Sequence, residues 1–169
     1  SAARFYLKNV AFYRAARVWY TIKGDPMIAK EDRSMVRQLS VFLENTKGRL
    51  AHMTRVLGEA GVDLLALSIA DTTNFGILRA IVDDNEKALA SLRAAGYTVN
   101  LTEVLAVTVP DRPGGLAEVL ETLLEKGVSV EYLYSFVRNP KEYALILFKV
   151  DDVAAARSIL ESRGVRILL

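Results

Sequence analysis

The stretch "VPDRPGGLAEVLETLLEKGVSVEYLYSFV" (Val109–Val137) contains the turn that decides the fold. The turn contains two prolines and two adjacent glycines. An alternating apolar run precedes it, and a run with apolar residues three and four apart follows it. Alternation is typical of a strand, and the wider spacing is typical of one face of a helix. Gly127 stands where a left-handed residue ends a helix, and a second strand-like run follows it. The stretch therefore predicts strand, tight turn, helix and strand.

The same pattern occurs 66 positions upstream. There "LSVFLENTKGRLAHMTRVLGEAGVDLLALSI" (Leu39–Ile69) aligns with Leu105–Ser135. After a loop that is two residues longer in the second copy, the match resumes at an offset of 68. The matched pairs include Gly48 with Gly114, Gly61 with Gly127, Asp83-Asp84 with Asp151-Asp152, and Gly96 with Gly164. Self-similarity at a fixed spacing indicates tandem structural units, so we interpret the body of the chain as a duplication.

Each copy reads as strand, helix, strand, strand, helix, strand. In the first copy we expect strands at 36–44, 62–70, 75–82 and 97–101, a turn at 72–74, and helices at 50–60 and 86–95. This order predicts an α+β chain of two tandem ferredoxin-like βαββαβ modules, with antiparallel sheets and helices on one face. We assign 35–102 to the first module, 103–169 to the second, and 1–34 to a leader outside the repeat. The sheets are expected to be able to join edge to edge, which would hide exposed strands.

The turn P-x-x-P-G-x-L of Pro110–Leu116, followed by an amphipathic helix and Gly127-Val128, resembles the signature of ACT domains. The body from about Met35 to Leu169 resembles a tandem ACT-domain protein. The resemblance implies a non-enzymatic, allosteric sensor that binds an amino acid at clefts between ACT modules and regulates metabolism. It implies a homodimer, and an enzyme of amino-acid metabolism as a further partner. The first copy departs from the signature, because Thr46-Lys47 stands where the second has Arg112-Pro113.

The turns are also candidate sites on physical grounds. A helix start leaves N–H groups unsatisfied and carries partial positive charge, which favours a carboxylate. Asp111 can accept from an ammonium group, and Arg112 can donate a fork to a carboxylate. We place the carboxylate at the N–H groups of residues 114–116 and 48–50, and expect the intact second turn to be the stronger seat. The ligand-binding candidates are Asn45, Lys47, Gly48, Arg49, Leu50, Ser68, Ile69, Asp111, Arg112, Pro113, Gly114, Gly115, Leu116 and Tyr134.

Other features have structural interpretations. His52 is the only histidine, and we expect an exposed or partly packed helix residue rather than a metal ligand. The pairs Asp83-Asp84 and Asp151-Asp152 each follow a strand and precede a helix, so we expect them to cap helices. Tyr132 and Tyr134 share a sheet face, where they either pack or line a ligand cleft.

Composition excludes several classes of protein. The chain has no cysteine, and no run of about 18 apolar residues that would span a membrane. We expect a cytoplasmic protein without cofactor or metal. The leader holds seven Lys/Arg against three acids, whereas the body holds 15 against 17. Such a body is not the footprint of a nucleic-acid-binding domain. The leader is either foreign to the mature protein or a basic amphipathic helix.

Two alternatives to the sensor remain open at this point. One is an interaction module that regulates an enzyme by docking, with ligand binding vestigial. The other is a small enzyme on the same frame, but no nucleophile, base and orienting group occur together in the sequence.

Overall fold

The computed structural model describes residues 36–71, 75–139 and 143–168. The leader, and the turn expected at Thr72–Asn74, lie outside the described residues.

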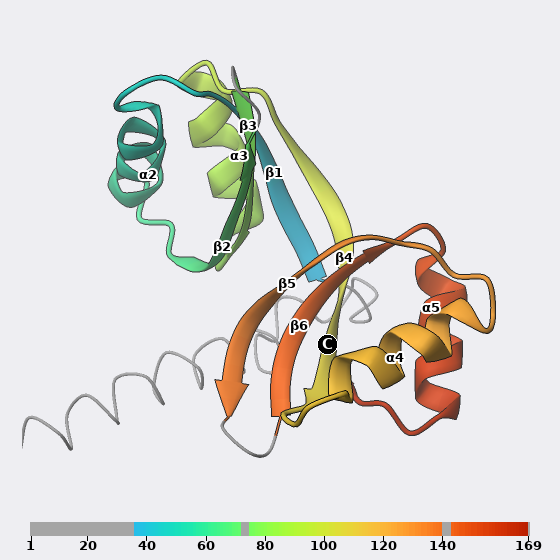
Figure 1. The fold of residues 1–169 in the computed structure, drawn as a ribbon. Helices are drawn as coiled ribbons and strands as arrows, with labels where there is room; N and C mark the ends of the chain where they lie inside the picture. The colour runs from blue at the N-terminus through green and yellow to red at the C-terminus, as the bar shows by residue number, and fades with distance from the viewer. Residues whose placement is uncertain (1–35, 72–74, 140–142, 169) are drawn as a thin grey trace, which may run out of the picture.

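The first module follows the predicted order. It comprises β1 (Val36–Glu44), α2 (Arg49–Glu59), β2 (Leu64–Asp71), β3 (Phe75–Val82) and α3 (Asn85–Ala94). Alternation in β1 turns Leu39, Val41 and Leu43 toward the helices, where all three are buried. Both helices cover one face of the sheet with apolar residues at helical spacing, such as Met53 and Leu57 of α2. None of the described helices covers the other face of this sheet, which we call the helix-free face (Figure 1).

The second module repeats this arrangement. Its elements are β4 (Val99–Pro110), α4 (Gly115–Leu124), β5 (Val130–Asn139), β6 (Tyr143–Val150), α5 (Val153–Ser162) and β7 (Ile167–Leu168). A core around fully buried Phe148 and Leu160 fills the space between its sheet and its helices. Two tandem βαββαβ modules are thus present, as the repeat predicts.

Strand β4 belongs to both modules. Its residues up to Val104 pair with β1, and its residues from Leu105 onward pair with β6 and, near the middle, with β7. We expected one strand at 97–101 and a separate one beginning the second module, so the expected division after residue 102 falls inside a continuous strand. The physical reason is that neither glycine nor proline interrupts residues 99–109, and β-branched residues recur along them.

The sheet folds back on itself about β4. Its strand order is β2-β3-β1-β4-β6-β5, and the two end strands β2 and β5 contact each other. Figure 1 shows the helices of the two modules on outer sides, so the helix-free faces meet at β4. An apolar cluster joins these faces and comprises Ile81, Val104, Ala106, Leu145 and Leu147, with Tyr134 packed against it. The modules therefore share a buried interface in addition to a strand.

Candidate functional site

The two strand–helix turns have the same backbone conformation despite their different sequences. Gly48 precedes α2 with φ 86° and ψ −12°, and Gly114 precedes α4 with φ 85° and ψ −14°. These left-handed angles favour glycine, which explains why it is kept in both copies. Thr46 N–H donates to the Glu44 carbonyl just as Arg112 N–H donates to the Pro110 carbonyl. The loss of proline in the first copy therefore leaves the shape of the turn unchanged.

Neither helix N-terminus is capped by a side chain. The N–H groups of Arg49 and Gly115 donate back into their own turns, to the carbonyls of Thr46 and Arg112. Within the described residues, the backbone N–H groups of the next two residues of each helix have no backbone acceptor: Leu50 and Ala51 in α2, Leu116 and Ala117 in α4. Of the donors expected from the sequence, only the N–H groups of Arg49 and Gly115 are taken up within their own turns, and the N–H groups of Ala51 and Ala117 each add a donor.

The two turns differ in the charged residues around them. Near α4, Arg112 Nη2 lies 2.7 Å from both carboxylate oxygens of Glu118, an acid in the first turn of the helix. Arg112 is thereby paired within its own module, and Glu118 already occupies the region of positive helix potential. The first turn of α2 has no acid, and His52 stands where α4 has Glu118. The α2 terminus is therefore the more electropositive of the two.

A cluster of side chains supports the α2 terminus. The His52 Nδ1 lies 2.6 Å from the hydroxyl of Tyr97, which donates to the Arg49 carbonyl at 3.3 Å. The Arg49 guanidinium lies 4.5 Å from the centre of the Tyr97 ring and 3.8 Å from Glu44. His52 is an exposed helix residue, as predicted. Sequence reasoning missed Tyr97, because only the fold brings it beside α2 from 45 residues away.

Close packing distinguishes Gly115 from its counterpart Arg49. A Cβ at Gly115 would overlap the carbonyl oxygen of Pro110, so the start of α4 lies very close to the end of β4. Arg49 carries a side chain at the equivalent position of the first module. The remaining turn candidates, Asn45, Lys47, Asp111 and Pro113, lie in the turns beside these helix starts.

The predicted site residues do not form one site. Since β1 and β4 are antiparallel neighbours, the turns that follow them lie at opposite ends of the molecule (Figure 1). Ser68 lies on the helix-free face of β2, and Ile69 lies on the opposite face with 43% of its surface exposed. Tyr134 lies in the interface between the modules, away from both turns.

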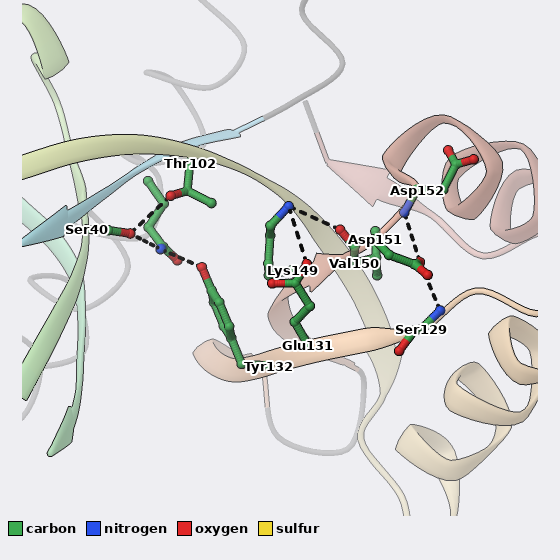
Figure 2. Close-up of polar contacts among 10 residues, drawn as sticks. Ser40, Thr102, Ser129, Glu131, Tyr132, Lys149, Val150, Asp151 and Asp152 are labelled. Atoms are coloured by element: carbon green, nitrogen blue, oxygen red, sulfur yellow. Dashed lines mark hydrogen bonds and ion pairs between the residues drawn. The ribbon is translucent and has the colours of Figure 1, made fainter. Parts of the chain in front are cut away.

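A polar network occupies that interface. Gln38, the one fully buried polar residue among those described, donates from Nε2 to Tyr132 at 2.9 Å and to Ser40 at 3.0 Å. Its Oε1 accepts from the Tyr134 hydroxyl at 3.0 Å, and Ser40 lies 3.1 Å from Thr102. Figure 2 shows Tyr132 reaching from β5 toward Ser40 and Thr102 of the other module. The two tyrosines thus pack in the interface and form hydrogen bonds across it.

Burial, and secondarily the neighbouring Tyr132, raises the pKa of Tyr134 well above its usual value, while Arg79 opposes this shift. The cause is that ionisation would place a negative charge in a largely apolar interface. Tyr134 therefore stays a neutral hydrogen-bond donor throughout the physiological range.

The second aspartate of each pair has the predicted capping role, and the first has a different structural role. Asp84 accepts from the N–H of Lys87 and Asp152 from that of Ala155, which caps α3 and α5. Asp83 and Asp151 instead accept from the backbone N–H groups of Asp63 and Ser129, at corresponding positions of the two modules. Figure 2 includes the second of these contacts. In the part of the chain that the structure describes, no group of three or more His, Cys, Asp or Glu residues is placed to hold a metal ion. None of the described helices is long and apolar enough to cross a membrane.

Comparison with solved structures identifies relatives of the whole pair. Protein BT0572 from Bacteroides thetaiotaomicron is 39% identical, with a TM-score of 0.75 over 80% of this chain and 92% of that one. The ligand-free regulatory subunit of aspartate kinase from Thermus thermophilus shares the fold at 16% identity, with a TM-score of 0.56 over 76% of this chain and 90% of that one. The corresponding subunit from Thermus flavus gives 15% identity and 0.53, over 75% and 92% of the two chains.

A search of curated proteins found no match. The model of one family, described as an ACT domain pair, matches residues 34–167, which span both modules and the shared strand. The chain therefore belongs to the family of ACT domain pairs.

Proposed function

We propose that this chain is a non-enzymatic regulatory sensor that binds the carboxylate of a free amino acid at the N-terminus of α2. The observation that carries this proposal is an uncapped helix N-terminus, with N–H groups of Leu50 and Ala51 that have no backbone acceptor. Oriented N–H groups and the helix dipole together favour an anion at such a place. Membership of the ACT pairs supports a regulatory role.

The balance of charge favours α2 over α4 as the main seat. Around the first turn, Lys47 and Arg49 outnumber Glu44, whereas around the second Arg112 is outnumbered by Asp111 and Glu118. A carboxylate arriving at α4 must displace or approach Glu118, which like-charge repulsion disfavours. We therefore propose that the carboxylate binds more strongly at α2, although the intact proline turn before α4 led us to expect the opposite.

The test is a thermal-shift screen of the full chain with the twenty amino acids, followed by calorimetry on any hit. A ligand that binds only the native state raises the melting temperature by mass action. Gly48→Ala and Gly114→Ala form a matched pair, because both residues have the same φ and a Cβ at either meets no atom within 4 Å. We expect similar losses of stability, but weakened binding only for Gly48→Ala.

Two results would contradict the proposal. If no amino acid at millimolar concentration shifts the melting temperature, the chain is not an amino-acid sensor. If Gly114→Ala weakens binding and Gly48→Ala does not, the seat lies at α4, as the intact proline turn led us to expect.

An exposed apolar patch supports a second candidate function, docking to a partner protein. Phe42, Phe75 and Ile77 lie together on the helix-free face of the first module, and each exposes 38–43% of its surface. The rings of Phe42 and Phe75 stack with centroids 4.9 Å apart. Under this alternative, Phe42→Ser abolishes regulation of an enzyme of amino-acid metabolism without changing any ligand-induced thermal shift. Light scattering of the purified chain then distinguishes a second copy from a different partner.

A further inference from the structure

We propose that Arg79 forms a second site, on the helix-free face of the first module, that binds a small monocarboxylate with an apolar substituent. This site is separate from the helix termini, and neither the sequence nor the family assignment points to it.

The site starts from a polar row that crosses the sheet. The strand registers place Ser68 beside Arg79, Arg79 beside Ser40, and Ser40 beside Asn100, so four neighbouring strands contribute one residue each. Alternation directs all four toward the helix-free face. The Ser40 hydroxyl already forms hydrogen bonds with Gln38 and Thr102. Arg79 is the single cation of the row.

Arg79 is held in place but has no anionic partner among the residues that the structure describes. Its guanidinium carbon lies 3.9 Å from the centre of the Tyr132 ring, which covers one face of the planar group. Its Nε is buried and has no hydrogen-bond partner. No carboxylate within the described ranges is paired with it, and Glu131, which precedes Tyr132 in the sequence, lies 3.9 Å from Lys149. An oriented guanidinium with a buried donor that has no acceptor is suited to receive a planar acceptor from outside the chain.

The surroundings define the class of ligand. A single cation with its donors in one plane matches a carboxylate, which accepts two parallel hydrogen bonds in that plane. Solvent reaches the row, since Asn100 is exposed and Ser68 is half-buried. Phe42 and Ile77 form the next cross-strand pair on the same face, two residues from Ser40 and Arg79. Both are exposed and can cover an apolar substituent. The expected ligand is therefore a branched or aromatic monocarboxylate rather than a phosphate, which would call for further cations.

The test follows the Arg79 side chain directly. In a nitrogen–proton correlation spectrum of the full chain, the Arg79 Nε–H signal is assigned by its loss in Arg79→Lys. Titration with sodium isobutyrate is expected to shift this signal saturably at millimolar concentrations, and acetate to bind more weakly. Sodium chloride at matched ionic strength should leave the signal unmoved.

Variants test whether isobutyrate binds at Arg79. By calorimetry, Arg79→Lys should weaken isobutyrate binding at least about tenfold, because an ammonium group cannot donate in the bidentate plane. The matched control Arg55→Lys, on the exposed surface of α2, should leave the affinity unchanged. Gly48→Ala should also leave the Arg79 shift intact, so a failure of the proposed amino-acid seat is distinguishable from a failure of this site.

The proposal is overturned if isobutyrate gives no saturable shift of the Arg79 signal. It is also overturned if inorganic phosphate shifts this signal at lower concentration than isobutyrate, or if Arg79→Lys binds isobutyrate as tightly as Arg55→Lys does. The titration itself uses the unmodified chain, and a variant is needed only to assign the signal.

Discussion

Gly115 and Gly58 are two helix glycines with opposite packing. A Cβ at Gly115 would overlap the Pro110 carbonyl oxygen, whereas one at Gly58 would meet no atom within 4 Å. We predict that Gly115→Ala lowers the free energy of unfolding by about 1–3 kcal/mol, because β4 and α4 must move apart. Gly58→Ala should raise it by up to about 1 kcal/mol, because alanine is the better helix former. Urea denaturation of both variants is the measurement, and equal effects would contradict the close approach.

The raised pKa of Tyr134 predicts how the stability of the chain changes at alkaline pH. Because its pKa is higher in the folded chain than in the unfolded chain, the folded state holds the proton more tightly. Its contribution to stability is therefore complete below the unfolded pKa of about 10, and falls as the pH rises above that value.

The measurement compares the unmodified chain with Tyr134→Phe in urea at pH 8 and pH 10.5. At pH 8 the variant should lose about 1 kcal/mol, because Gln38 Oε1 loses its donor. At pH 10.5 the difference between the two proteins should shrink, because phenylalanine has no proton to lose. A difference that stays constant with pH would show that the pKa of Tyr134 is the same in the folded and unfolded chains, and a difference that grows would show that folding lowers it.

Some residue roles were predictable and others were not. The capping aspartates Asp84 and Asp152, and left-handed Gly127 with φ 76°, could be identified because their roles depend on neighbours within a few residues. Gln38 and Arg79 gave no signal, because each looks like an ordinary polar residue on an alternating strand. Their partners Tyr132 and Tyr134 lie more than ninety positions away from Gln38. Of the donors expected at α2 and α4, only those of Arg49 and Gly115 are used by local bonds within each turn.

At the scale of elements, duplication makes a quantitative prediction about the caps of α3 and α5. Asp84→Ala and Asp152→Ala should each cost about 1 kcal/mol, because each removes the acceptor of one N–H group at a helix start. The double variant should cost the sum of the two, since the helices belong to different modules. Asp84→Asn and Asp152→Asn are the controls, because asparagine keeps the acceptor. Thermal and urea unfolding provide the measurement, and a large loss for the asparagine variants would argue against capping.

Strand β4 shows where element prediction fails. The first and third strands of the first module were predicted with the bounds that the structure shows, because alternation ends at recognisable turn residues. The sequence divided the modules after residue 102, and the backbone runs through that position as one strand of 12 residues. Local sequence signals where a strand turns, but not where its hydrogen-bond partners change from β1 to β6.

At the scale of the whole molecule, the interface between the modules should be energetically coupled. Gln38→Leu leaves the hydroxyls of Tyr132 and Tyr134 without their partner, and should cost about 1–3 kcal/mol. Combined with Tyr134→Phe, it should cost less than the sum, by about 0.5 kcal/mol or more. Gln38→Leu combined with Gly58→Ala is the control, because Gly58 lies on the distant helix α2. Strict additivity of both pairs in urea denaturation would mean that the network does not join the modules energetically.

The sequence by itself determined the duplication, the βαββαβ order, the helix caps and the resemblance to ACT domains. These follow from periodicity, glycine and proline placement, and internal repeats, all of which act over short stretches of chain. Only the tertiary structure decided that the helix-free faces meet, that the two turns lie at opposite ends, and that Arg79 faces Tyr132. These features depend on how β4 continues from one sheet into the other and brings residues far apart in the sequence into contact, which no local pattern specifies.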